Sequence, residues 1–116
     1  MIELIVKDWL AKKLAVPVCT EVPEGPPASF VVVEKTGSGR KNYIDSATVA
    51  VKSYGETLYK AALLNEEVKA AMDSLPEHPA VSAARLNSDY PFNDTTTKRR
   101  RYQAVYNITY HDNAAQ

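Results

Sequence analysis

The sequence predicts a two-layer α+β fold, with two helices packed on a mostly antiparallel or mixed sheet of four to five strands in the order α-β-β-β-α-β-β. Two segments repeat apolar residues every three or four positions, as amphipathic helices do. Five others are rich in β-branched residues or alternate apolar and polar residues, as strands do. The 116 residues are 45% hydrophobic and 24% charged, which suits one globular domain with a real core. We therefore expect a single domain over residues 1–116 with a flexible tail at about 111–116.

The N-terminal half predicts one helix and three strands. Residues 2–14 carry apolar side chains on one side of a helix, and Pro17 then ends the helix and starts a short strand over residues 16–22. The β-branched run in residues 29–36 predicts a second strand, and residues 46–54 alternate as a third. Between them, two glycines and polar neighbours predict a mobile connection over residues 36–45, poorly ordered in an isolated subunit.

Residues 55–74 have the strongest helical pattern. Ser53 and Glu56 have capping-box spacing, although Gly55 is an equally good start. The face expected to meet the core is formed by Leu58, Ala61, Leu64, Val68, Ala71, Met72 and Leu75. Tyr59 and Leu63 fall on the opposite side, which predicts a second apolar strip that packing on a sheet does not require.

The C-terminal third predicts two strands joined by a long polar segment. Residues 80–86 form a weak strand pattern, residues 87–101 are mostly polar, and residues 102–110 alternate strongly. One face of the last strand is predicted to be core or interface, and it carries Tyr102, Ala104, Tyr106, Ile108 and Tyr110.

The residue types that carry chemistry are scattered. Cys19, His78 and His111 are isolated singles, whereas a structural zinc site needs four ligands in short spacings. Glu66 and Glu67 form a carboxylate pair, but on the outer, solvated side of the helix. No stretch approaches the ~20 apolar residues that span a bilayer. We therefore expect no enzyme activity, catalytic residue, metal, cofactor or membrane partner.

Two basic segments allow more than one interpretation. Residues 37–41 are similar to a phosphate-binding loop, but they lack Walker spacing, which favours a flexible connection. The run from Lys98 to Tyr102 has four adjacent cations beside an aromatic, which suits nucleic-acid contact, a solvated loop or a subunit interface. Lysine plus arginine equals aspartate plus glutamate at 14 each, and this zero net charge favours the solvated loop over a nucleic-acid site.

The order of several short motifs resembles that of a known family. They are Glu21-Val22-Pro23, the segment from Phe30 to Gly37, Thr48-Val49-Ala50-Val51, Ala61-Ala62-Leu63-Leu64, Glu66-Glu67-Val68, Leu75-Pro76, the segment from Tyr90 to Asp94, and Arg101-Tyr102-Gln103. In this order, from Ile2 to about Tyr110, the chain resembles the tail terminator, or tail completion, proteins of long-tailed bacteriophages and prophages with non-contractile tails. It departs from the family at Tyr54, where Trp is common, and at Asn93, where Pro is common.

The resemblance implies a structural function. Six copies would form a ring on the last ring of the tail tube, would stop its polymerisation, and would face the head–tail connector. The implied partners are further copies of the chain, the major tail tube protein, the connector protein, and DNA that passes through the lumen without specific binding. The implied location is the head–tail junction of the virion, and the bacterial cytoplasm during assembly.

Eight residues are candidate assembly contacts: Tyr59, Leu63, Arg40, Lys41, Tyr90, Phe92, Arg99 and Arg101. Tyr90 and Phe92 flank a proline, which limits the entropy lost on docking. Arg99 and Arg101 are expected to pair with carboxylates of a neighbour. The alternative is a small α+β module that binds nucleic acid or a ligand, and its support is the basic run and the tyrosine-rich last strand.

Overall fold

The computed structural model describes residues 1–95 and 99–111 of the chain. Its elements are α1 (Ile2–Lys13), β1 (Val18–Cys19), β2 (Phe30–Lys41), β3 (Ile44–Gly55), α2 (Leu58–Asp73), the 3₁₀ helix η1 (Leu75–Glu77), β4 (Val81–Pro91) and β5 (Arg100–Tyr110). The five strands form one sheet in the order β1-β2-β3-β5-β4. Only β1 and β2 pair in parallel, and the other pairs are antiparallel. The predicted fold class and element order are confirmed.

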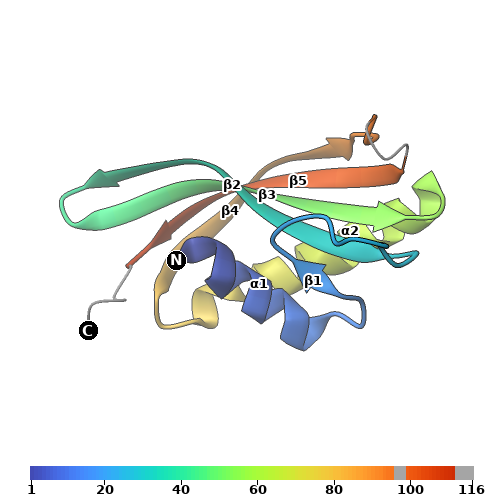
Figure 1. Cartoon of the computed structure of the whole chain (residues 1–116). Helices are drawn as coiled ribbons and strands as arrows, with labels where there is room; N and C mark the ends of the chain where they lie inside the picture. Colours follow the sequence, from blue (N-terminus) through green and yellow to red (C-terminus); the bar gives the residue numbers. More distant parts are fainter. Residues whose placement is uncertain (96–98, 112–116) are drawn as a thin grey trace.

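Both helices cover one face of this sheet, and the opposite face, here called the open face, carries neither of them (Figure 1). The core lies between the layers. Its members include Ile2, Leu10 and Met72 from the helices and Val49, Tyr106, Ile108 and Tyr110 from the strands. On α1, Ile2, Val6 and Leu10 are buried, as the helical pattern predicts. The predicted face of β5 is buried at Ala104, Tyr106, Ile108 and Tyr110, whereas Tyr102 is only half-buried. A second, smaller cluster on the open face holds Phe30, Val32 and Tyr54.

The predicted strand at residues 16–22 shrinks to the two residues of β1. The Pro17 carbonyl accepts a hydrogen bond from the Val31 amide at 2.9 Å, and pairing ends after Cys19. Three prolines follow within residues 23–27 and offer no amide hydrogen to a ladder. A long loop therefore leads from β1 to β2.

The predicted mobile connection is instead the end of a long hairpin. We call residues 36–45 the arm. Its two strands are paired up to Lys41 and Ile44, so that a two-residue turn at Asn42 and Tyr43 joins them. Both turn residues have positive φ, at 52° and 65°, as a type I′ hairpin turn requires. The expectation failed because the two glycines lie inside the ladder and the turn uses other residues. The arm extends well beyond the helices (Figure 1).

The start of α2 also differs from both predicted starts. Thr57 is the N-cap, and its hydroxyl accepts a hydrogen bond from the Lys60 amide at 3.1 Å. Gly55 is the last residue of β3, where the backbone of the strand passes close to the backbone of α2. A side chain does not fit at this position, because an added Cβ would lie 2.7 Å from the Ala61 nitrogen. Leu58, predicted to be core, is 40% exposed because it lies in the first turn of the helix.

The loop between the last two strands is shorter than the predicted polar segment at residues 87–101. The strand β4 continues to Pro91 and β5 begins at Arg100. Shifts of register near Ser82 and Asn87 interrupt the β4–β5 ladder, and β4 is the outer strand of the sheet. An outer strand with one solvated face accommodates polar residues, which is why the segment did not look like a strand. Lys98 and the tail at 112–116 lie outside the described residues.

Candidate assembly surfaces

The tip of the arm carries Arg40 and Lys41, two of the predicted contacts. Cross-strand partners share a face of a hairpin. Arg40 therefore lies on one face with Asp45, at 3.6 Å, and Lys41 lies on the other face with Ile44. Tyr43 at the turn is 86% exposed and Ile44 is 42% exposed. The arm tip, residues 40–45, thus presents an aromatic, an aliphatic and a basic side chain close together.

The outer side of α2 carries Tyr59 and Leu63, two further predicted contacts. They are 72% and 49% exposed, so the predicted phase of the helix is confirmed. Glu67 and Ala70 are also exposed and continue the same side toward the end of the helix. We call Tyr59, Leu63, Glu67 and Ala70 the α2 strip. It begins near Gly55, at the end of the sheet opposite the arm tip (Figure 1).

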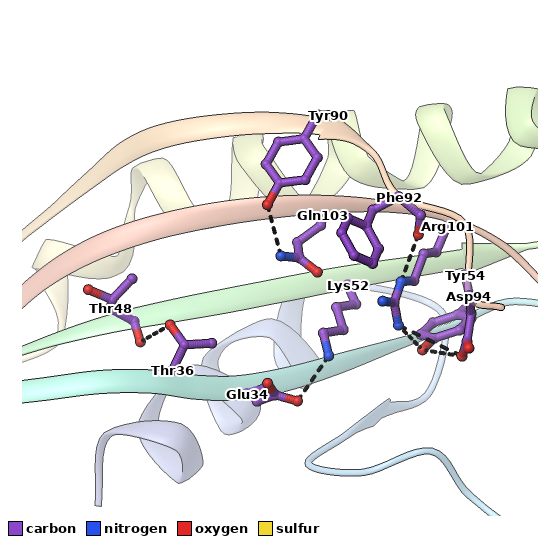
Figure 2. A network of polar contacts seen from close by, with 10 residues as sticks. All are labelled: Glu34, Thr36, Thr48, Lys52, Tyr54, Tyr90, Phe92, Asp94, Arg101 and Gln103. Carbon is purple, nitrogen blue, oxygen red and sulfur yellow. Dashed lines mark hydrogen bonds and ion pairs between the residues drawn. The ribbon is translucent and has the colours of Figure 1, made fainter. Parts of the chain in front are cut away.

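Arg101 lies at this end of the sheet, in a network of contacts within the chain (Figure 2). Its Nη1 donates to the Tyr54 hydroxyl at 2.8 Å and lies 3.7 Å from Asp94 Oδ2, and its Nε donates to the Phe92 carbonyl at 2.7 Å. The guanidinium also lies 4.8 Å from the Phe92 ring centre. Only 11% of the Arg101 side chain and 13% of the Asp94 side chain are exposed. This arginine therefore anchors the start of the β4–β5 connection to the sheet.

Arg99 holds a second segment against the same end. Its guanidinium donates to the carbonyls of Pro27 and Pro26, at 3.0 and 3.4 Å, and lies 5.8 Å from the Phe30 ring centre. Phe30 in turn stacks on Tyr54 at 4.4 Å. The two arginines predicted to pair with a neighbour thus both have partners in their own chain.

Tyr90 and Phe92 lie side by side next to this network, with ring centres 6.1 Å apart. The Tyr90 hydroxyl accepts a hydrogen bond from Gln103 at 3.0 Å, and Phe92 is 47% exposed (Figure 2). Burial raises the pKa of Tyr54, and the hydrogen bond from Arg101 acts in the opposite direction. Of these aromatic residues, Phe92 leaves the largest apolar area open to a partner.

Away from the cluster of Phe30, Val32 and Tyr54, the open face of the sheet is mostly polar, and it holds local ion pairs as well as the exposed Arg85. Lys52 Nζ lies 2.9 Å from Glu34, and the Thr36 hydroxyl donates to the Thr48 carbonyl at 3.3 Å (Figure 2). A shallow groove at the base of the arm is lined mainly by glycine, hydroxyl and amide groups, from Gly37, Ser38, Gly39, Ser46, Thr48, Asn107 and Thr109.

A buried polar contact between α2 and β4 was not predicted. Asn65 is 1% exposed and donates to Asp89 at 2.8 Å, and Lys69 lies 2.9 Å from the same carboxylate. The hydrogen bond that Lys69 donates to Asp89 lowers the pKa of Asp89 and raises the pKa of Lys69. Sequence periodicity gave no signal for Asn65, because the pairing depends on a strand 24 residues away.

The remaining residues singled out by sequence lie apart. The described residues contain no group of three or more His, Cys, Asp and Glu side chains able to hold a metal ion. His78 lies edge-on to Trp9 at 6.2 Å, and Glu66 and Glu67 are exposed. Within the described part of the chain, no helix is long and apolar enough to cross a membrane.

Sequence reasoning missed Tyr43 and Ile44 at the arm tip and Asp94 in the arginine network. Tyr43 gave no signal because a turn with positive φ is normally marked by glycine. Asp94 is seven residues from Arg101, a separation that no local pattern connects. The prediction of a mobile connection over residues 36–45 concealed the paired strands of the arm.

Comparison with known proteins gives a likeness among solved structures alone. No protein-family model and no curated protein matches the chain. Among solved structures, a chain of a structure described as the virion of a native gene transfer agent particle is similar, with a TM-score of 0.44 and 11% identity over 92% of this chain and 84% of that chain. At this level the likeness supports no conclusion about function.

Proposed function

We propose that the chain is a structural protein of a phage or phage-like virion, a tail terminator that forms a ring of six copies on the last ring of the tail tube. In this role it ends tube growth, meets the connector, and leaves a lumen for DNA. It acts at the head–tail junction after assembly in the bacterial cytoplasm. The role needs no catalytic site and no cofactor.

The observation that carries the proposal is the arm. From Glu34 to Lys41, every residue of β2 is exposed, although residues 30–33 of the same strand are buried. An exposed hairpin with a basic, aromatic tip contributes nothing to the core of its own chain. It is the kind of element that reaches a neighbouring subunit.

The distribution of exposed side chains supports a ring over a two-fold dimer. The arm tip lies at one end of the sheet, and the α2 strip and Phe92 lie at the other. When two different surfaces of one chain meet, the contact is heterologous, and it closes into a ring if the rotation fits. The resemblance in motif order between Ile2 and Tyr110 points to the same kind of assembly.

Charge pairing on the open face suits a wall that does not retain DNA. Lys52 pairs with Glu34, and Arg101 pairs with Asp94. The whole chain has a formal net charge of zero. A chain without excess positive charge gives little overall attraction for phosphates.

The alternative, a nucleic-acid-binding module, has less support. The side chains of Arg99 and Arg101 are held by carbonyls and by Asp94 of their own chain. Of the tyrosines on β5, Tyr106 and Tyr110 are buried in the core, so they offer no surface on which bases stack. A salt-dependent shift of short oligonucleotides by the purified protein would favour this alternative.

Loss of the gene in its phage or prophage tests the proposed function. Without a cap, tube growth has no stop, so electron microscopy should show tail tubes of uneven, excessive length and heads without tails. The wild-type gene supplied in trans should restore tails of uniform length. Normal infectious particles in the absence of the protein would contradict the proposal.

A further inference from the structure

We infer that the arm tip of one copy docks on the α2 strip of the next copy. The inference rests on the proposed ring and names its contact. The partner surface is a second copy of this chain, and the contact joins Lys41, Tyr43 and Ile44 to Tyr59, Leu63 and Glu67.

The first argument is the conformation of Tyr43. Its φ of 65° is one that a bulky side chain rarely adopts, and Asn followed by Gly is the preferred pair for such a turn. An aromatic ring at this position is 86% exposed and packs little against its own chain. Strain of this kind persists where the side chain serves a purpose other than folding.

The second argument is the chemical complementarity between the arm tip and the α2 strip. The arm tip presents an aromatic, an aliphatic and a basic residue, and the α2 strip presents an aromatic, an aliphatic and an acidic residue. Lys41 and Ile44 share one face of the hairpin, while Arg40 on the other face already has Asp45 as a partner. The side of the tip that carries Lys41 is therefore the side that suits Glu67. Glu66, one residue earlier, already pairs with Lys69 at 3.0 Å, so Glu67 is the carboxylate that the strip offers.

The third argument is distance. With about 3.3 Å per residue, the 12 residues of β3 put roughly 36 Å between the arm tip and Gly55. Leu63 lies only about 8 Å into α2. The tip cannot reach the strip of its own chain, so the contact has to join two copies, and each copy offers one tip and one strip. Figure 1 shows the arm and the start of α2 at opposite ends of the sheet.

The first test is Tyr43→Gly. Because Asn-Gly fits the turn better, the melting temperature of the isolated chain should rise by about 2–5 °C. Loss of a central aromatic contact should at the same time raise the concentration needed for ring assembly by about tenfold or more. A purely structural role for Tyr43 predicts a change in melting temperature alone. Unchanged assembly of this variant would overturn the inference.

A matched pair of leucines tests the other side of the contact. Leu63→Asp should leave the chain folded and prevent rings on tail tubes, because Leu63 is 49% exposed and faces away from the core. Leu4→Asp is the control, since Leu4 on α1 is 44% exposed and lies outside the strip. Equal loss of rings in both variants would contradict a specific contact at the strip.

Disulfide cross-linking tests the contact directly. In a Cys19→Ser background, chains with Tyr43→Cys are mixed with chains with Leu63→Cys and assembled on tail tubes. A cross-linked dimer should form in the mixture and not with either chain alone. Rings that cap tubes but give no cross-link would overturn this contact and leave the proposed function intact. If the wild-type chain forms no ring on tubes, both proposals fail.

Discussion

The two halves of β2 have the same backbone conformation and opposite environments. Residues 30–33 are all buried, with Val31 and Val33 beneath the helices. Residues 34–41 are all exposed, although they also pair with β3, with a shift of register between Lys35 and Gly37. The difference shows that ladder hydrogen bonds and a few exposed cross-strand contacts extend this hairpin beyond the core. We conclude that the first half stabilises the fold and that the second half serves a partner.

The largest difference between the halves should come from a buried charge. Val33→Asp places an unpaired carboxylate in the core and should destabilise the chain by about 4 kcal/mol or more. Ser38→Asp places the same group in the exposed half and should change the stability by no more than about 0.5 kcal/mol. Urea denaturation measures both, and a similar loss in the two variants would contradict a division of β2 into two halves.

Two arginine–aspartate pairs, one buried in the body and one exposed on the arm, should differ in their contribution to stability. Arg101→Ala removes one partner of Asp94, which also accepts a hydrogen bond from the Tyr54 hydroxyl, together with the Arg101 bonds to Tyr54 and to the Phe92 carbonyl, and should destabilise the chain by about 2–4 kcal/mol. Arg40→Ala breaks the pair with Asp45 on the arm, where 65% of the Arg40 side chain is exposed, and should change the stability by less than about 0.5 kcal/mol. Thermal or urea unfolding of the two variants would show whether this order holds.

The next largest effect on stability should come from alkaline pH, which ionises a tyrosine in the core. Burial raises the pKa of Tyr106 to about 12 from 10.0. Since the folded-state pKa is the higher one, the full stability is present below pH 10 and is lost as the pH rises toward 12. By pH 12 the wild type should lose about 2 kcal/mol more than Tyr106→Phe. Part of the decline should remain in the variant, because burial also raises the pKa of Tyr54. Identical pH profiles for both proteins would show that Tyr106 is not shielded from water as described.

The smallest predicted changes in stability come from replacing two glycines by alanine. Gly55→Ala should destabilise the chain by about 1–2 kcal/mol, because the new methyl group would meet the Ala61 backbone at 2.7 Å. Gly37→Ala on the arm should have little effect or a slightly stabilising one, since nothing lies within 4 Å of the added carbon. A difference in melting temperature between the two variants measures this contrast.

Sequence predicted the body of the molecule better than its projecting parts. Apolar periodicity found both helices and every strand that packs on them, because burial leaves a repeating pattern. It failed in the arm, where exposed glycine, serine and lysine lie in a ladder and no burial marks the strand. It also failed for contacts between distant segments, such as Arg101 with Asp94 and Asn65 with Asp89.

Among the candidate contacts, the sequence found the exposed side of α2 and the basic end of the arm. It assigned Arg99 and Arg101 to a neighbour, whereas the structure gives both of them partners in their own chain. Whether they also contact another copy stays a prediction. Tyr43 was missed because its backbone conformation is set by the turn and not by its own preference.

The most direct test is to shorten the arm. Replacing residues 40–45 with Asn-Gly keeps Gly39 opposite Ser46 and supplies a favoured type I′ turn, so the body should fold as before. We predict an unchanged or higher melting temperature and no rings on tail tubes by electron microscopy. Normal rings and tails of uniform length with the shortened chain would contradict the assignment of the exposed half of β2 to assembly.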